Sequence, residues 1–239
     1  MTNEVISDAV KIAISDEGPE NFLPPVGTYP APRETVMVGI ASYDWNVDVE
    51  CMGGLMQCMQ WYAQPAIYKG MSAINLARNV IAHLFVEKTK YEHLVFVDTD
   101  IIFMPSDWHL LWEGPEDLVT AEYAKKILGL PPTKFGLGFT RIHRSVFEKI
   151  KDLRTEDGDE RVLRFFRDGE LYVDYFPTGA TQDSTWLGED QGFFRWAALT
   201  GVKPRVETRT RLGHVGKFIY GYPDQIPGYK LVDLTDGVQ

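Results

Sequence analysis

The stretch His93-Leu-Val-Phe-Val-Asp98-Thr-Asp100 decides the fold that the sequence predicts. Its apolar run, Leu94 to Val97, is typical of a strand that is buried on both faces of a sheet. Two aspartates separated by one residue follow directly, so the strand is expected to end in an acidic turn. In open α/β sheets, ligands bind outside the carboxyl ends of the strands. This turn is therefore the first candidate site.

The elements around this strand alternate between strands and helices. Residues 35–42 and 117–123 have the pattern of two more buried strands. Helical spacing of apolar residues predicts helices at 49–62, 71–88 (with Ser72 as the N-cap), 105–112, 145–151 and 193–199. This alternation predicts an α/β fold with a mostly parallel sheet flanked by helices, in a single domain over residues 35–239. Residues 1–34, which are acidic and contain several prolines, are expected to form an N-terminal arm.

Size and composition limit the kind of protein. A chain of 239 residues and 27.2 kDa can form one substantial domain. It contains neither an apolar run long enough to cross a bilayer nor a secretory signal, so we expect a cytoplasmic protein with no membrane partner. Cys51 and Cys58 lie seven residues apart on one predicted helix, about 10 Å apart and too far for a disulfide. We expect both to be small buried core residues.

The charge is uneven along the chain. A formal net charge of −10 argues against a protein that coats nucleic acid indiscriminately. From Arg195 to Lys217, however, six basic residues stand against one acid, Glu207. This segment suits either a site for a phosphate-bearing ligand or a solvated basic surface.

The side chains of Asp98 and Asp100 can converge on one hard divalent cation. Oxygen ligands suit Mg²⁺ or Mn²⁺, and a diphosphate adds further oxygens to the same ion. The alternative is a plain turn in which the aspartates cap backbone amides.

Two later segments carry groups that complement this turn. Glu189 and Asp190 precede a predicted helix, where a carboxylate can accept a proton from an attacking hydroxyl or simply favour the helix dipole. His214 and Lys217 lie in one short glycine-containing segment. Imidazole can complete a manganese shell and an ammonium can neutralise a diphosphate, although a plain loop histidine is the alternative.

In order and spacing, these segments resemble glycosyltransferases of the GT-A fold that carry an Asp-x-Asp motif. The likeness spans residues 36–222. It rests on the segments Gly39-Ile-Ala-Ser42, Ala77-Arg-Asn79, Phe96-Val-Asp-Thr-Asp100, Val119-Thr-Ala-Glu-Tyr123, Gly136-Leu-Gly138, Leu187-Gly-Glu-Asp190 and His214.

The resemblance implies a nucleotide-sugar donor, with UDP as the default nucleotide, and Mn²⁺ or Mg²⁺ as cofactor. Asp100 would bind the metal directly, Asp98 would hold it through water or lie near the donor ribose, and His214 would be the third protein ligand. Other donor-binding residues follow from the same resemblance: Ala41, Ser42 and Tyr43 around the nucleobase, Arg78 beside the nucleotide, and Lys217 on the diphosphate. Arg78 has an alternative, an ion pair with Glu87 or another acid.

The resemblance also implies which residues act on the acceptor. Asp190 would be the base that activates the acceptor hydroxyl in an inverting enzyme, with Glu189 as the second choice. Gly136 and Gly138 would border the acceptor, where a side chain would crowd the substrates. The sequence does not decide between inversion and retention of anomeric configuration.

A compact catalytic domain of this kind is similar to bacteriophage glycosyltransferases that modify hydroxymethylated pyrimidines in DNA. That likeness makes DNA one expected acceptor, in a host cytoplasm, with a glycan, lipid or protein hydroxyl as the alternative. Phosphate contacts could come from Arg141, His143, Arg144 and Lys149, and a flipped base could stack on Phe193, Phe194 and Trp196, unless these rings fill the core. A metal-dependent nucleotide-sugar hydrolase and a non-catalytic binding module are the rival functions.

Overall fold

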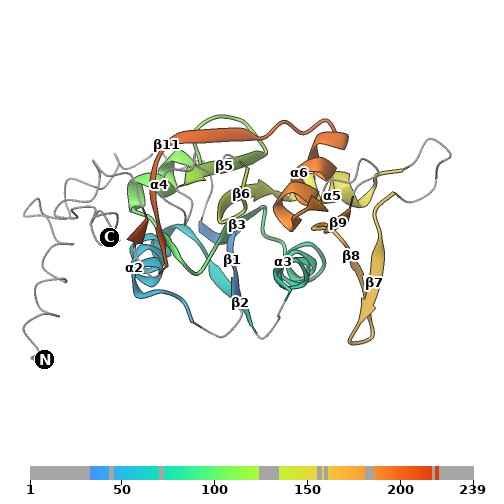
Figure 1. Cartoon of the computed structure of the whole chain (residues 1–239), viewed down its shortest axis with the longest axis horizontal. Coiled ribbons are helices and arrows are strands. Elements are labelled where there is room, and N and C mark those ends of the chain that lie inside the picture. Colours follow the sequence, from blue (N-terminus) through green and yellow to red (C-terminus); the bar gives the residue numbers. More distant parts are fainter. Residues whose placement is uncertain are drawn as a thin grey trace, which may run out of the picture.

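The computed structural model describes residues 33–42, 46–69, 73–123, 135–154, 158, 161–180, 186–216 and 219–220. Within this part of the chain an eight-stranded sheet has the order β12-β11-β5-β6-β3-β1-β2, with β4 paired to β11 (Figure 1). Its strands are β1 (Val36–Ser42), β2 (Gln64–Lys69), β3 (His93–Val97), β4 (Ile101–Ile102), β5 (Leu118–Tyr123), β6 (Phe139–His143), β11 (Arg205–Val215) and β12 (Ile219–Tyr220). Residues 1–32 of the predicted arm lie outside the described residues.

The central sheet is mostly parallel. Strand β1 pairs in parallel with both β2 and β3, and β5 pairs in parallel with β11. Strand β6 lies between β3 and β5 and is antiparallel to both, so those two neighbours run in the same direction. The predicted fold class is therefore confirmed, with one reversed strand inserted at the centre.

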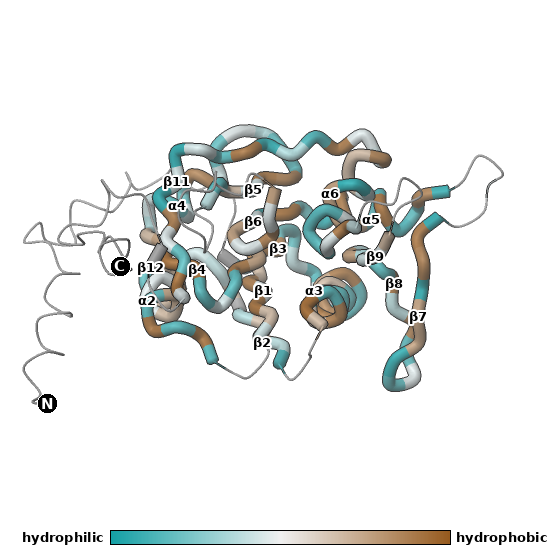
Figure 2. Tube along the Cα trace, in the orientation of Figure 1, coloured by the Kyte–Doolittle hydropathy of each residue, from teal (hydrophilic) through white to brown (hydrophobic). Residues whose placement is uncertain are grey.

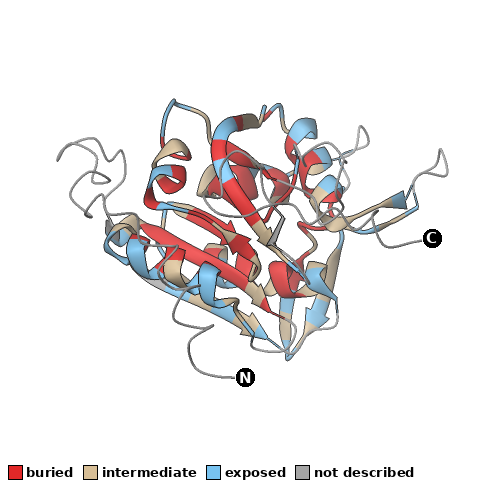
Figure 3. Cartoon of the chain, turned by 60° about the vertical axis from the view of Figure 1, so that its left-hand side comes forward, coloured by how far each residue is buried: buried red, intermediate tan, exposed pale blue. Residues whose placement is uncertain are grey.

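Helices cover both faces of this sheet. The helices are α2 (Val49–Cys58), α3 (Ile74–His83), α4 (Pro105–Leu110), α5 (Arg144–Lys151) and α6 (Glu189–Leu199). Buried residues of α3, α5 and α6 pack with Met37, Leu94 and Phe96, whereas those of α2 and α4 pack with Val36 and Val95. Because side chains alternate along a strand, these two sets lie on opposite faces of the sheet. Figure 3 shows the strands buried between these layers, and Figure 2 shows the apolar and polar positions of each helix.

The predicted helices are confirmed, with differences at their ends. A 3₁₀ turn (Met59–Trp61) extends α2, and a π-helical turn (Leu84–Lys88) extends α3. The predicted cap Ser72 lies outside the described residues, and Ala73 occupies the N-cap position of α3. Helix α6 begins at Glu189, one turn before the predicted start, because Gly188 is its N-cap.

Five strands of the eight-stranded sheet, β2, β4, β6, β11 and β12, were not predicted. Strand β2 contains Pro65, which is tolerated because β2 is an edge strand. Strand β6 is short, and β11 has the charged sequence Arg-Val-Glu-Thr-Arg-Thr-Arg at its start. Two short hairpins, β7 (Arg164–Arg167) with β8 (Glu170–Val173) and β9 (Gly179–Ala180) with β10 (Trp186–Leu187), complete the described strands.

The two cysteines and the lengths of the helices can be compared with what the sequence predicts. Both cysteines are free and buried in α2, as predicted. None of the helices among the described residues combines the length and apolarity that a membrane crossing requires.

Helix α2 packs closely against the segment that follows the acidic turn. A Cβ added at Gly54 would lie 2.8 Å from the backbone oxygen of Phe103, whereas one added at Gly53 would meet nothing within 4 Å. We therefore expect Gly54→Ala to lower the free energy of unfolding by about 1–3 kcal/mol, because α2 must shift. Gly53→Ala is the matched control and should raise it by up to about 1 kcal/mol. Urea denaturation measures both, and equal effects of the two substitutions would contradict this packing.

Candidate functional site

Backbone hydrogen bonds hold the acidic turn at the end of β3. The Asp98 amide donates to the Gly138 carbonyl (2.9 Å), and the Ile101 amide donates to the Asp98 carbonyl (3.2 Å). The Asp48 amide, just before α2, donates to the Thr99 carbonyl (2.9 Å). The turn is thus tied to two other segments, and its side chains project from a fixed backbone.

Arg78 of α3 joins this turn to the start of α6. Its side chain is only 1% exposed, and Nη2 donates to Asp98 Oδ1 at 2.8 Å. Nη1 donates to Glu189 Oε1 at 2.9 Å and also to Asp190 Oδ1. The structure therefore places Arg78 beside the Asp-x-Asp turn, paired with the predicted catalytic acids. Glu87, the other acid suggested for Arg78, pairs instead with Lys151.

This cluster sets one positive charge against three carboxylates. Burial acts to lower the pKa of Arg78, but the charges of Asp98, Asp190 and Glu189 outweigh it and raise that pKa. The pKa of Asp190 is raised to about 6, because burial and the charges of Glu189 and Asp98 together outweigh Arg78 and the Leu137 amide, which lower it. A general base works best when its pKa lies near the working pH. Asp190 has this property.

His214 comes from the far end of the chain to the same turn. Strand β11 pairs antiparallel with β4, so His214 lies opposite Ile101. The Val215 amide donates to the Asp100 carbonyl at 2.7 Å. His214 Nε2 lies 3.2 Å from Asp100 Oδ1. Two of the three predicted metal ligands are therefore in contact.

The side chains of Asp100 and His214 fit a divalent ion better than the predicted set of three ligands, which also includes Asp98. A carboxylate oxygen and an imidazole nitrogen are ligands that Mn²⁺ accepts. The third predicted ligand, Asp98, directs Oδ1 to Arg78. Across the described ranges, no three or more His, Cys, Asp or Glu side chains are grouped as a metal site would require. The geometry thus suits an ion held by Asp100 and His214, with oxygens of a ligand completing its shell.

Tyr123 is a site residue to which the sequence assigned no role. It ends β5, its side chain is 6% exposed, and its ring meets the His214 ring edge-on, with centroids 5.7 Å apart. A Cβ added at Gly138 would lie 2.9 Å from Asp98 Oδ2 and 3.2 Å from the Tyr123 hydroxyl. Tyr123 therefore contacts His214 and lies close enough to Asp98 to feel the charge of that carboxylate. Its position at the carboxyl end of a parallel strand was the signal available in the sequence.

The two glycines expected near the acceptor differ in position. Gly138 lies against the Asp98 carboxylate, so a side chain there would displace that group. The Gly136 carbonyl accepts hydrogen bonds from the buried hydroxyls of Thr120 (2.6 Å) and Thr140 (2.8 Å). Gly136 thus anchors the segment behind the site, and Gly138 lies within it.

The residues expected around the nucleobase lie partly outside the description. Ala41 and Ser42 end β1 at the same sheet edge as the acidic turn, because β1 and β3 are parallel neighbours. Ser42 is buried, and its hydroxyl donates to the Asn46 carbonyl at 3.2 Å. Tyr43 and Lys217, predicted to contact the donor, lie outside the described residues.

Four of the cations proposed for phosphate contacts form ion pairs or hydrogen bonds within the fold. Arg205 and Arg209 both pair with Glu207, which is 2% exposed. Burial acts to raise the pKa of Glu207, but hydrogen bonds from these arginines outweigh it and lower that pKa to about 2. Arg141 donates to the Leu111 and Glu116 carbonyls, and Arg144 donates to carbonyls that include those of Tyr91 and Val86. These four side chains support the fold.

The aromatic residues proposed to stack a flipped base are core residues, and that proposal was wrong. Phe193 and Phe194 are 0% and 8% exposed, and Trp196 is partly buried against the same core. The Phe193 ring stacks on Phe176, with centroids 5.1 Å apart. Helix α6 turns this side inward because its apolar residues cover the sheet.

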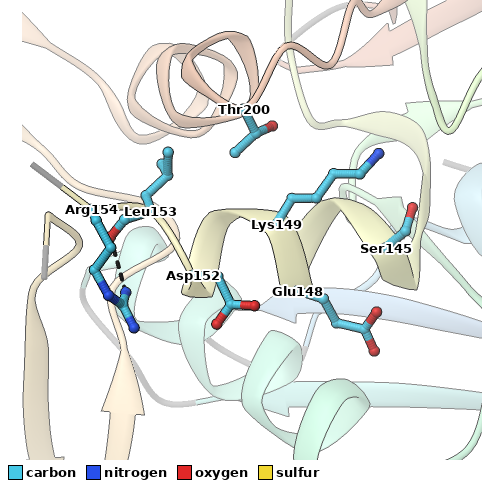
Figure 4. A pocket seen from close by; sticks show the side chains of 7 residues that line it. All are labelled: Ser145, Glu148, Lys149, Asp152, Leu153, Arg154 and Thr200. Carbon is cyan, nitrogen blue, oxygen red and sulfur yellow. Dashed lines mark hydrogen bonds between the residues drawn. The ribbon is translucent and has the colours of Figure 1, made fainter. Parts of the chain in front are cut away.

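A cavity of about 470 Å³ lies along the outer side of α5, apart from these groups. Lys149, one of the residues proposed for phosphate contacts, lines it, but the predicted catalytic and metal-binding residues do not. Figure 4 shows its lining residues: Ser145, Glu148, Lys149, Asp152, Leu153, Arg154 and Thr200.

No protein-family model and no curated protein matches the chain. Among solved structures, the crystal structure of A197 from STIV matches with a TM-score of 0.51 and 15% identity, over 82% of this chain and 98% of that one. The two proteins share a fold. This likeness extends over nearly the whole of the STIV protein.

Two glycosyltransferases match with TM-scores below 0.5. The catalytic domain of Drosophila beta1,4galactosyltransferase 7, in complex with xylobiose, has a TM-score of 0.44 and 12% identity, over 74% of this chain and 66% of that one. A glycosyltransferase involved in the glycosylation of the major capsid of PBCV-1 has a TM-score of 0.33 and 12% identity, over 47% and 62%.

Removing the charge of Arg78 should destabilise the protein in a pH-dependent way. Arg78→Met leaves three carboxylates close together without their cation, and we expect a loss of about 3–5 kcal/mol at pH 8. The loss should shrink at pH 5, because carboxylates without the cation take up protons more readily. Urea denaturation at both pH values measures it.

Glu189→Gln is the control for this prediction. It keeps a hydrogen-bond acceptor and removes one of the three negative charges, so it should change stability by less than about 1 kcal/mol. A loss in Arg78→Met that is the same at both pH values would show that charge is not the cause.

Proposed function

We propose that the chain is a divalent-metal-dependent GT-A-type glycosyltransferase that transfers a sugar from a nucleotide-sugar donor to a hydroxyl acceptor. One observation carries the proposal: buried Arg78 joins the Asp98 turn to Asp190, a carboxylate with a pKa of about 6. The same turn meets His214 through Asp100. These contacts bring together, near the carboxyl ends of parallel strands, the side chains that would hold a metal and accept a proton.

The donor would bind along this edge, with a UDP-sugar as the first choice. Asp98 would face the ribose, while Ala41, Ser42 and Tyr43 would surround the base. Asp100 and His214 would hold Mn²⁺ or Mg²⁺, which supplies positive charge where the leaving diphosphate becomes negative. Lys217 would add a second positive charge to the same group.

Transfer then needs one proton acceptor and one leaving group. The acceptor oxygen forms a bond to the anomeric carbon, and Asp190 takes the hydroxyl proton. The bond from the anomeric carbon to the phosphate oxygen breaks, and the nucleoside diphosphate leaves with that electron pair. Arg78 orients Asp190 for this step through their direct ion pair. An enzyme that retains configuration has no such base, so the anomer of the product tests the role of Asp190.

The function is tested by incubating the protein with Mn²⁺, a panel of nucleotide sugars, and hydroxyl acceptors that include glycosides and hydroxymethylcytosine DNA. Mass spectrometry should detect a product heavier by one sugar, and chelation should abolish it until Mn²⁺ or Mg²⁺ is returned. Asp100→Asn should lower the rate at least about a hundredfold, because the metal loses a ligand. Asp168→Asn, which changes an aspartate with 81% side-chain exposure on the β7–β8 turn, is the matched control.

Each rival function predicts a different result in this assay. Donor loss at a rate independent of every acceptor would identify a nucleotide-sugar hydrolase, in which the same acids activate water. Donor binding without turnover, unchanged by Asp100→Asn, would identify a binding module.

The pH dependence should report the ionisation of Asp190. Since a base must be deprotonated to accept a proton, kcat/KM should rise with pH through about 6, the pKa of Asp190. Initial rates between pH 4.5 and 8 at saturating Mn²⁺ measure this limb. Asp190→Asn should abolish transfer, whereas Glu189→Gln should keep the rise of kcat/KM with pH. Residual activity of Asp190→Asn with an unchanged limb would assign the titration to another group.

A further inference from the structure

We infer that the acceptor is an uncharged sugar and that it stacks on the exposed ring of Phe135. This inference rests on the proposed glycosyl transfer and names the substrate class for the same site.

Phe135 lies close to the part of α6 that carries Asp190, the proposed general base. The segment from Phe135 to Gly138 follows one face of α6: the Phe135 ring meets Phe194 edge-on, with centroids 5.5 Å apart. The Leu137 amide hydrogen-bonds to Asp190. Asp190 and Phe194 are four residues apart in α6, so they lie on the same face of the helix, with their Cβ atoms about 5–6 Å apart. The Phe135 ring therefore contacts α6 one turn after the proposed proton acceptor, Asp190.

The Phe135 ring is held in place yet open to ligand. Its side chain is 49% exposed, whereas its neighbour Phe194 is 8% exposed. Contact with Phe194 limits the orientations of the ring, so binding a ligand on its open side costs little conformational entropy. Aromatic rings that are fixed on one side and exposed on the other provide large contact areas for ligands.

A pyranose suits this arrangement. One face of the sugar presents C–H groups that pack on an aromatic ring, while its hydroxyls point outward from the rim. A sugar lying on Phe135 can direct a hydroxyl toward Asp190, which lies one turn before Phe194, the residue that the ring contacts in α6. The ring thus binds the acceptor, and Asp190 receives the proton from it.

The charges around the site favour an acceptor without phosphates. In the donor complex the charge of the metal would be offset by the diphosphate, whereas Asp98, Glu189 and Asp190 outnumber Arg78, the cation that they surround, so a polyanionic acceptor meets net negative charge. Two cations of the basic segment, Arg205 and Arg209, are paired with Glu207. A neutral glycoside meets no such repulsion.

Acceptor kinetics test the inference. Methyl glycosides of glucose, galactose, mannose, xylose and N-acetylglucosamine are compared with hydroxymethylcytosine duplex DNA. The donor is the nucleotide sugar that the panel assay selects. We expect the highest kcat/KM for one of the glycosides. Phe135→Ala and Phe135→Leu should raise its KM about tenfold, the effect of losing one aromatic contact, with a smaller change in kcat. Phe135→Trp, which keeps an aromatic ring, should leave the acceptor KM low.

Phe166→Ala is the matched control, since Phe166 is 78% exposed on the projecting β7–β8 hairpin (Figure 1). It should leave the acceptor KM unchanged. Phe135→Leu keeps apolar bulk, so its KM remains informative if Phe135→Ala misfolds.

Two kinds of failure are distinguishable. Faster transfer to DNA than to every glycoside, donor hydrolysis with no glycoside accepted, or an unchanged KM in both Phe135 variants overturns the inference and leaves metal-dependent donor chemistry intact. Absence of any Mn²⁺-dependent donor consumption overturns the proposed function itself.

Discussion

The site depends on one buried cation, the guanidinium of Arg78. Removing such a group from water costs several kcal/mol, which only close partners can offset. Asp98, Glu189 and Asp190 provide those partners, and they belong to two elements other than α3. The interaction therefore fixes the turn after β3, helix α3 and the start of α6 relative to one another. Without it, three carboxylates would face each other in a partly buried space.

The same interaction links stability to chemistry. Arg78 keeps the pKa of Asp190 from rising further, while burial and the neighbouring acids keep it above that of an ordinary aspartate. The result is a carboxylate that changes charge near pH 6, held by a side chain that cannot move freely. Groups positioned by packing and ion pairs are better oriented for reaction than groups on an unsupported loop. His214 is positioned in a comparable way, by the pairing of β11 with β4.

Features with a local signal were predicted well. Apolar runs identified β1, β3 and β5, and helical spacing identified α2 to α6, because burial of one face leaves a period in the sequence. The charged strand β11 has no such period: it buries Glu207 by pairing it with Arg205 and Arg209. The same pairing engages two of the six cations of the basic segment.

Local patterns were sufficient to place an Asp-x-Asp turn at the carboxyl end of a buried strand, and to predict the layered α/β fold around it. Only long-range packing brought Arg78 to acids 111 and 112 residues away, and His214 to an aspartate 114 residues away. It also turned Phe193 and Phe194 into the core and left Phe135 half exposed. The physical reason is that strand order and register, rather than sequence spacing, decide which distant side chains meet.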